Sequence, residues 1–146
     1  MNILYALFSL LLILNSSEKI NDKEMIFQTG ESQDPKGLIL LKKHCYQCHN
    51  PNTTSHDEIL APPLFGIKSH YKKAYPESEQ FIRTMVDFVK NPMEEKALMK
   101  GPIKRFGLMK NPELNQEDIQ IIVEYLESND LEKPVWFEQH KKSGNQ

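Results

Sequence analysis

Apolar residues recur at helical spacing in three segments of this chain of 146 residues. The first segment covers residues 34–44, where Asp34 is the predicted N-cap and Pro35 the first helical residue. The second covers residues 76–91 and ends at an Asn-Pro pair. The third covers residues 115–129 and begins with an Asn cap and acidic residues in the first turn. No alternating strand pattern is evident, so the sequence predicts an all-α protein.

Irregular stretches separate the predicted helices. Residues 50–55 consist of Asn, Pro, Thr and Ser, a loop composition. Residues 61–66 contain two prolines, which cannot continue a helix because proline lacks the backbone N–H. Residues 99–112 are expected to form loops or short helical turns around glycine and proline.

The N-terminus carries an apolar run over residues 3–14, followed by Asn and two Ser. The run has the length of a signal core and is short of the roughly 20 residues that span a bilayer. We therefore expect residues 1–17 to be a signal peptide or an N-terminal anchor, with possible membrane anchoring through residues 3–14. Residues 18–33 are polar without a sustained period and are predicted to be a linker.

The remaining sequence is expected to form one domain over residues 34–130 and a C-terminal extension over residues 131–146. A formal net charge of −2 and a hydrophobic content of 39% suit one small globular domain. The mild acidity argues against nucleic acid as a partner. Trp136, the only tryptophan, is expected to anchor the extension, and covering an edge of a cofactor is the other possibility.

Cys45 and Cys48 are the two cysteines of the chain, and His49 follows them directly. This Cys-x-x-Cys-His pattern is the attachment motif for c-type haem. Residues three and four apart share a helix face, so all three side chains can face one flat ligand. The two thiols would form thioethers with the haem vinyl groups, and the imidazole would bind the iron on its proximal side. The motif thus predicts one covalently attached haem c and an electron carrier.

Other uses of the two thiols are less consistent with the sequence. A redox-active Cys-x-x-Cys normally follows a strand in a thioredoxin-like unit, and no such strand is predicted. A structural zinc site needs four Cys or His ligands, usually as two spaced pairs. A disulfide between Cys45 and Cys48 would close a very small loop and gain little stability. Zinc binding by a structural domain and dithiol chemistry are the alternatives to haem.

The segment from Asp34 to Asn129 resembles class I cytochrome c, in particular the small bacterial monohaem c-type cytochromes. Gly37 and Leu41 match a small and a large apolar position on the family's N-terminal helix. Ile122 and Tyr125 match the residues that face them on the C-terminal helix. The resemblance implies the cytochrome c fold, in which three main helices surround a covalent haem and the N- and C-terminal helices cross beside it.

The resemblance also implies the iron's surroundings. The family has a Pro-x-Leu-x-Gly stretch whose proline carbonyl accepts the free N–H of the proximal histidine, and Pro62 stands in that position. The family often takes its distal ligand from a methionine in the loop before the C-terminal helix. Of the six methionines, Met109 fits this place best. Met99 and His70 are the alternatives.

The resemblance implies an exported protein of the bacterial periplasm that shuttles one electron between larger redox complexes. Its partners would be redox proteins, bound transiently as electron donor and acceptor. The resemblance therefore implies an electron-transfer protein with both axial positions filled, and not an enzyme. The alternative is a haem-containing enzyme subunit with an open iron site.

Overall fold

A computed structural model of the chain describes residues 34–139. The predicted signal or anchor, residues 1–17, and the predicted linker, residues 18–33, lie outside the described residues. All regular structure within the described range is helical. Its elements are α2 (Lys36–His44), the 3-10 turn η1 (His56–Glu58), α3 (Leu64–Ala74), α4 (Ser78–Lys90), α5 (Lys100–Phe106) and α6 (Gln116–Ser128).

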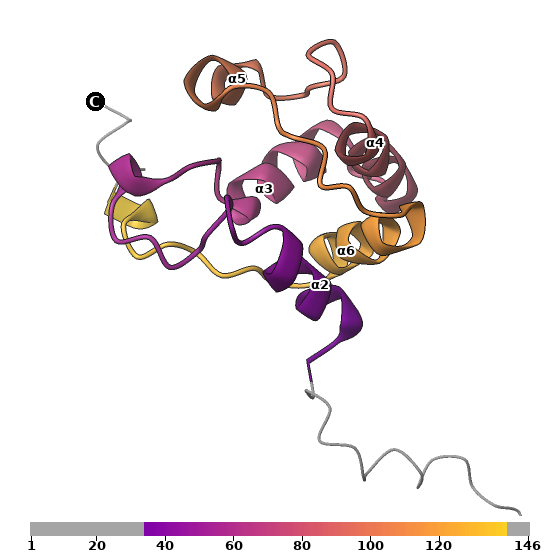
Figure 1. Ribbon diagram of the computed structural model, residues 1–146, viewed down its shortest axis with the longest axis horizontal. Helices are drawn as coiled ribbons and strands as arrows, with labels where there is room; N and C mark the ends of the chain where they lie inside the picture. Colours follow the sequence, from indigo (N-terminus) through magenta and orange to yellow (C-terminus); the bar gives the residue numbers. More distant parts are fainter. Residues whose placement is uncertain (1–33, 140–146) are drawn as a thin grey trace, which may run out of the picture. The chain divides into compact units, whose positions relative to one another are not determined.

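Helix α6 is the centre of the packing, since it contacts α2, α3 and α4. Figure 1 shows these four helices together and α5 standing apart from them. Four side chains, one from α2, one from α4 and two from α6, are buried almost completely: Leu41, Phe81, Ile119 and Val123. Removing such a side chain from water stabilises a fold by about 1.5–3 kcal/mol. The helices expected from apolar spacing therefore supply the core.

Helices α4 and α6 agree with the prediction to within a residue or two at each end. α6 begins after Asn115, whose side-chain oxygen accepts a hydrogen bond of 2.8 Å from the backbone N–H of Asp118. That bond satisfies one of the N–H groups that a helix start leaves without a partner. The acidic residues of the first turn also suit the positive end of the helix.

The predicted start of α2 is wrong by one residue. Pro35, not Asp34, occupies the N-cap, because its carbonyl accepts hydrogen bonds from the N–H groups of Leu38 and Ile39. The Asp34 carboxylate instead accepts a hydrogen bond of 2.8 Å from the Lys42 ammonium group. An ion pair within the segment thus replaces the expected side-chain cap.

Helix α3 was not expected, because the two prolines of residues 61–66 indicated a loop. Pro63 occupies the N-cap of α3, where its missing N–H costs nothing. From there Leu64, Ile67 and Tyr71 follow at helical spacing and pack against the core. The two prolines cannot continue a helix, but here they precede the start of one.

In the stretch from 99 to 112, the expected short helical turn is present as α5, which ends at Gly107 with a φ of +81°.

Candidate functional site

Helix α2 presents the Cys-x-x-Cys-His motif at its C-terminal end. The Cys45 N–H still donates to the Leu41 carbonyl at 2.9 Å, and the Cys45 carbonyl accepts from Cys48 at 3.2 Å and from His49 at 2.9 Å. The motif therefore adds a helical turn after the last helical residue. Cys45 is half-buried, Cys48 is exposed, and both carry free thiols. The two sulfurs are available for a covalent bond to a ligand.

His49 and Pro62 meet across the site. The His49 Nδ1 atom lies 2.6 Å from the Pro62 carbonyl oxygen. A carbonyl can only accept, so Nδ1 carries the proton and Nε2 keeps its lone pair. Pro62 precedes the N-cap of α3, and its carbonyl therefore has no donor within that helix. The start of the unexpected helix leaves this oxygen available to orient the imidazole.

Burial favours the uncharged forms of the His49 imidazole and the Cys45 thiol. It lowers the pKa of His49, an effect that the hydrogen bond to Pro62 partly offsets. It also raises the pKa of the Cys45 thiol to about 11. At neutral pH the site therefore offers a neutral imidazole with one free nitrogen and a protonated half-buried thiol. The neutral imidazole suits an axial ligand of haem iron, and the thiol is free to form a thioether.

The described residues do not form a metal site from side chains alone. Among residues 34–139, no group of three or more His, Cys, Asp or Glu side chains is placed to hold a metal ion. Zinc would need about four such ligands. The two thiols and one imidazole of the motif fit a porphyrin, which supplies four ligands of its own, better than they fit a bare ion.

The candidates for the distal ligand lie on other segments. Met99 is the N-cap residue of α5, and Met109 follows the same helix after Gly107; both methionines are half-buried. His70 lies on α3 and is exposed. The structure thus brings the two thiols, His49 and Pro62 together at one place, and it puts both methionine candidates at the ends of α5.

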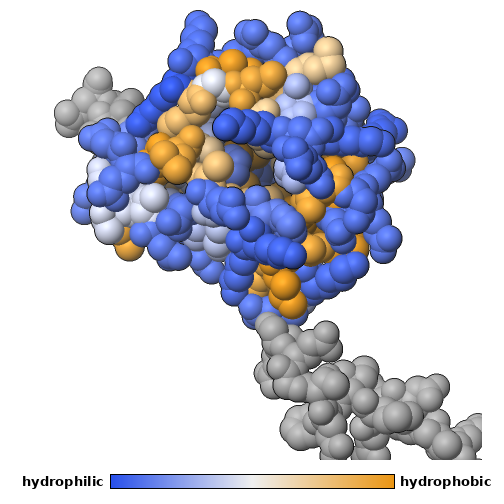
Figure 2. Space-filling model, in the orientation of Figure 1, coloured by the Kyte–Doolittle hydropathy of each residue, from blue (hydrophilic) through white to orange (hydrophobic). Residues whose placement is uncertain are grey.

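Some apolar side chains near the site in sequence are exposed. Figure 2 shows hydrophobic surface in the upper part of the view, on the side where Figure 1 places α5, and also on the right and at the bottom. Leu60, just before the Pro62 segment, is 69% exposed, and Leu108, next to Met109, is 41% exposed.

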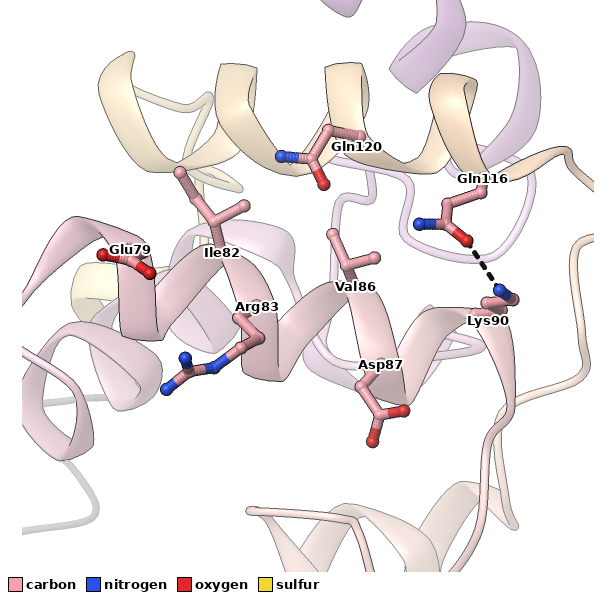
Figure 3. Close-up of a pocket in the computed structure, with 8 residues that line it drawn as sticks. All are labelled: Glu79, Ile82, Arg83, Val86, Asp87, Lys90, Gln116 and Gln120. Atoms are coloured by element: carbon pink, nitrogen blue, oxygen red, sulfur yellow. Dashed lines mark hydrogen bonds between the residues drawn. The ribbon is translucent and has the colours of Figure 1, made fainter.

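A separate depression lies between α4 and α6 (Figure 3). It has a volume of about 590 Å³, and its lining includes Ile82, Val86 and Gln120. A hydrogen bond of 2.6 Å between Lys90 and Gln116 closes one end. None of the predicted haem residues lines it, so it is not the haem site.

The helix crossing expected beside the site is present. A Cβ atom added to Gly37 on α2 would lie 2.5 Å from the Tyr125 Cβ on α6, so only glycine permits this approach. Leu41, one turn further along α2, is fully buried. Ile122 on α6 belongs to the same buried cluster.

These features agree with a comparison against known families, in which the family model described as cytochrome c matches residues 36–130. The chain belongs to the cytochrome c family. It is a class I c-type cytochrome with an all-α fold, and its cofactor is covalently attached haem c. Bound haem supplies an iron that takes up and releases one electron as it cycles between its ferric and ferrous states.

The cytochrome is also similar to an uncharacterized protein of Aquifex aeolicus (strain VF5). The two are 28% identical over 134 residues, which cover 80% of this chain and 87% of the relative. No solved structure matches the chain. Within residues 34–139, no helix is long and apolar enough to cross a membrane.

Several contacts around the site had no counterpart in the sequence analysis. Trp136 in the C-terminal extension is buried and donates from Nε1 to the Thr53 hydroxyl at 3.1 Å, consistent with the anchoring role expected for it. The Arg105 guanidinium donates to the His56 ring at 2.7 Å and to the His56 carbonyl at 3.0 Å. The two residues of each pair are far apart in the chain, so no periodic pattern in the sequence could predict these contacts.

Proposed function

We propose that this cytochrome is an exported monohaem carrier that moves one electron at a time between larger redox proteins, with His49 and Met109 as axial ligands. The observation that carries the proposal is the contact between His49 Nδ1 and the Pro62 carbonyl. It fixes the tautomer that leaves Nε2 for iron, and it makes the imidazole a stronger donor. Membership in the cytochrome c family supports electron transfer as the role, in preference to catalysis.

The choice of Met109 is supported by its surroundings. It is half-buried in the loop between α5 and α6, whereas His70 points to solvent on α3. A thioether is a soft, neutral ligand that favours ferrous iron and raises the reduction potential. Met99, at the other end of α5, is the competing ligand.

Export is supported by the family and by the apolar run over residues 3–14, which lies outside the described residues. Members of the family are typically exported, and we propose the bacterial periplasm as the compartment. The partners there would be an electron donor and an electron acceptor that bind weakly and leave quickly.

The ligand assignment is tested by comparing Met109→Ala with Met99→Ala, each purified with its haem. In the wild type both axial positions are filled, so the reduced protein should not bind carbon monoxide at neutral pH. Met109→Ala should keep its covalent haem, bind carbon monoxide and lose on the order of 0.1 V of reduction potential, because axial ligands set the potential over a range of roughly 0.8 V. Met99→Ala should behave as the wild type does.

Two outcomes would contradict the proposal. Carbon monoxide binding by Met99→Ala but not by Met109→Ala would assign the distal position to Met99. Carbon monoxide binding by the reduced wild type would indicate an open iron site, and the haem subunit of an enzyme would then replace the carrier.

A further inference from the structure

The segment Leu131–Gln139, here called the C-terminal strap, follows the region that the family model matches. It returns from the end of α6 to the loop behind the Cys-x-x-Cys-His motif, and Figure 1 shows the two side by side. Within the strap, Trp136 is only 8% exposed, while its neighbour Val135 is 81% exposed. The strap therefore packs against the domain through some of its side chains, such as Trp136, and exposes others.

Trp136 joins the strap to the loop that leaves His49. Its Nε1 donates to the hydroxyl of Thr53, four residues after the histidine, at 3.1 Å. Its ring meets the His56 ring edge to face, with centroids 5.1 Å apart. Both contacts bear on the chain just after the proximal ligand.

Phe137 joins the strap to the start of α3. Its ring is perpendicular to that of Phe65, with centroids 4.4 Å apart. The Lys133 ammonium group lies 4.9 Å from the centroid of the same Phe65 ring. Phe65 comes three residues after Pro62, in the first turn of α3.

The strap thus contacts both segments that meet in the hydrogen bond between His49 and Pro62. One contact is four residues from the donor and the other is three residues from the acceptor. α5 holds the first of these segments as well, through the hydrogen bonds from Arg105 to His56. Two chain segments brought together by side-chain contacts so near a hydrogen bond have little freedom to separate.

We propose that the C-terminal strap positions the Pro62 carbonyl against the proximal histidine and thereby sets the reduction potential of the iron. This inference rests on the proposed function, because both assume that His49 is an axial ligand of the iron. A tight bond to Nδ1 gives the imidazole more anionic character and stabilises ferric iron. Loosening the strap weakens the bond, so the reduction potential rises.

The test uses the full-length holoprotein with Trp136→Leu and Phe137→Leu. Val135→Ala is the matched control, since it changes an exposed residue of the same segment. Phe137→Tyr keeps the ring and should retain wild-type behaviour. Two properties are measured: the midpoint potential, and the rate at which the His49 Nδ1 proton exchanges with solvent, followed by NMR.

Both leucine variants should keep covalent haem, have a higher midpoint potential and exchange the Nδ1 proton about tenfold faster or more, as expected when local opening becomes easier. Val135→Ala should change neither property. If the leucine variants lose thermal stability but keep the wild-type potential and exchange rate, the strap only stabilises the fold and the proposal is overturned. If Trp136→Leu does not accumulate as holoprotein, Phe137→Leu decides alone, because that side chain is only half-buried.

Failure of this proposal is distinguishable from failure of the carrier function. An open iron site would reveal itself through carbon monoxide binding by the unaltered protein. The exchange rate of the His49 proton does not depend on which residue, if any, fills the distal position.

Discussion

Gly37 determines how closely α2 approaches α6. The hydrogen atom that glycine carries in place of a side chain faces Tyr125, and an added Cβ would also lie 3.1 Å from the Ile121 carbonyl oxygen. Neither the Tyr125 Cβ nor a helix carbonyl can move without moving its backbone. The crossing of α2 and α6 positions the end of α2 and therefore the haem motif. This crossing depends on the absence of a side chain at Gly37.

Gly37→Ala should lower the free energy of unfolding. Overpacking costs about 1–3 kcal/mol, and the better helix propensity of alanine offsets about 1 kcal/mol at most. Denaturant titration of the holoprotein measures the net effect. Gly101→Ala is the control, because a Cβ there meets no atom within 4 Å. Equal stability of both variants would show that α2 and α6 do not pack as closely as described.

At the scale of elements, Glu127 connects three helices. Its carboxylate on α6 accepts hydrogen bonds from the Lys72 ammonium group on α3 and from the Ser78 hydroxyl at the start of α4. These bonds, that from Lys72 above all, lower the pKa of Glu127. A carboxyl whose pKa is lower in the folded state stabilises the fold above its unfolded pKa, and this stabilisation is lost as the pH falls through the folded value.

Glu127→Gln should therefore reduce the free energy of unfolding at pH 7 by about 1 kcal/mol, the upper end for a partly exposed ion pair. The difference from the wild type should begin to shrink as the pH falls below the ordinary carboxyl value of 4.5 and should vanish in stronger acid. Denaturation curves at a series of pH values measure it. Glu124→Gln is the control, because Glu124 lies on the same helix but is paired with the neutral Gln120. A pH-independent loss in Glu127→Gln would mean that charge is not what connects the helices.

The elements differ in how far the sequence could predict them. α4 and α6 combine a full apolar face with clear end signals, so these patterns were sufficient to predict both helices. α3 was missed because Pro62 and Pro63 were weighed as helix breakers, whereas their position just before Leu64 makes them a helix start. The Asp34 cap was wrong because an ion pair with Lys42 competes for the same carboxylate. Local rules thus placed the helices that have a clear apolar face to within a residue or two, and they missed α3, whose start is marked by prolines.

For the whole molecule, the motif and the family resemblance predicted the fold and the cofactor from a few residues of fixed spacing. Spacing could not reveal the C-terminal strap, because the partners of Trp136 and Phe137 lie far away in the chain. The described core is small, and apolar side chains such as Leu60 remain exposed beside the site. A haem attached at Cys45 and Cys48 would complete such a core, and the chain without it is expected to fold poorly.

The most direct test of this account is the intact mass of the denatured protein, purified from a host that exports and matures c-type cytochromes. Denaturation removes any haem that is held only by coordination or packing. The account predicts the mass of the chain plus one haem, with the added mass on the peptide that contains Cys45, Cys48 and His49. The mass of the chain alone, or a mass lower by the two hydrogens of a disulfide, would contradict it.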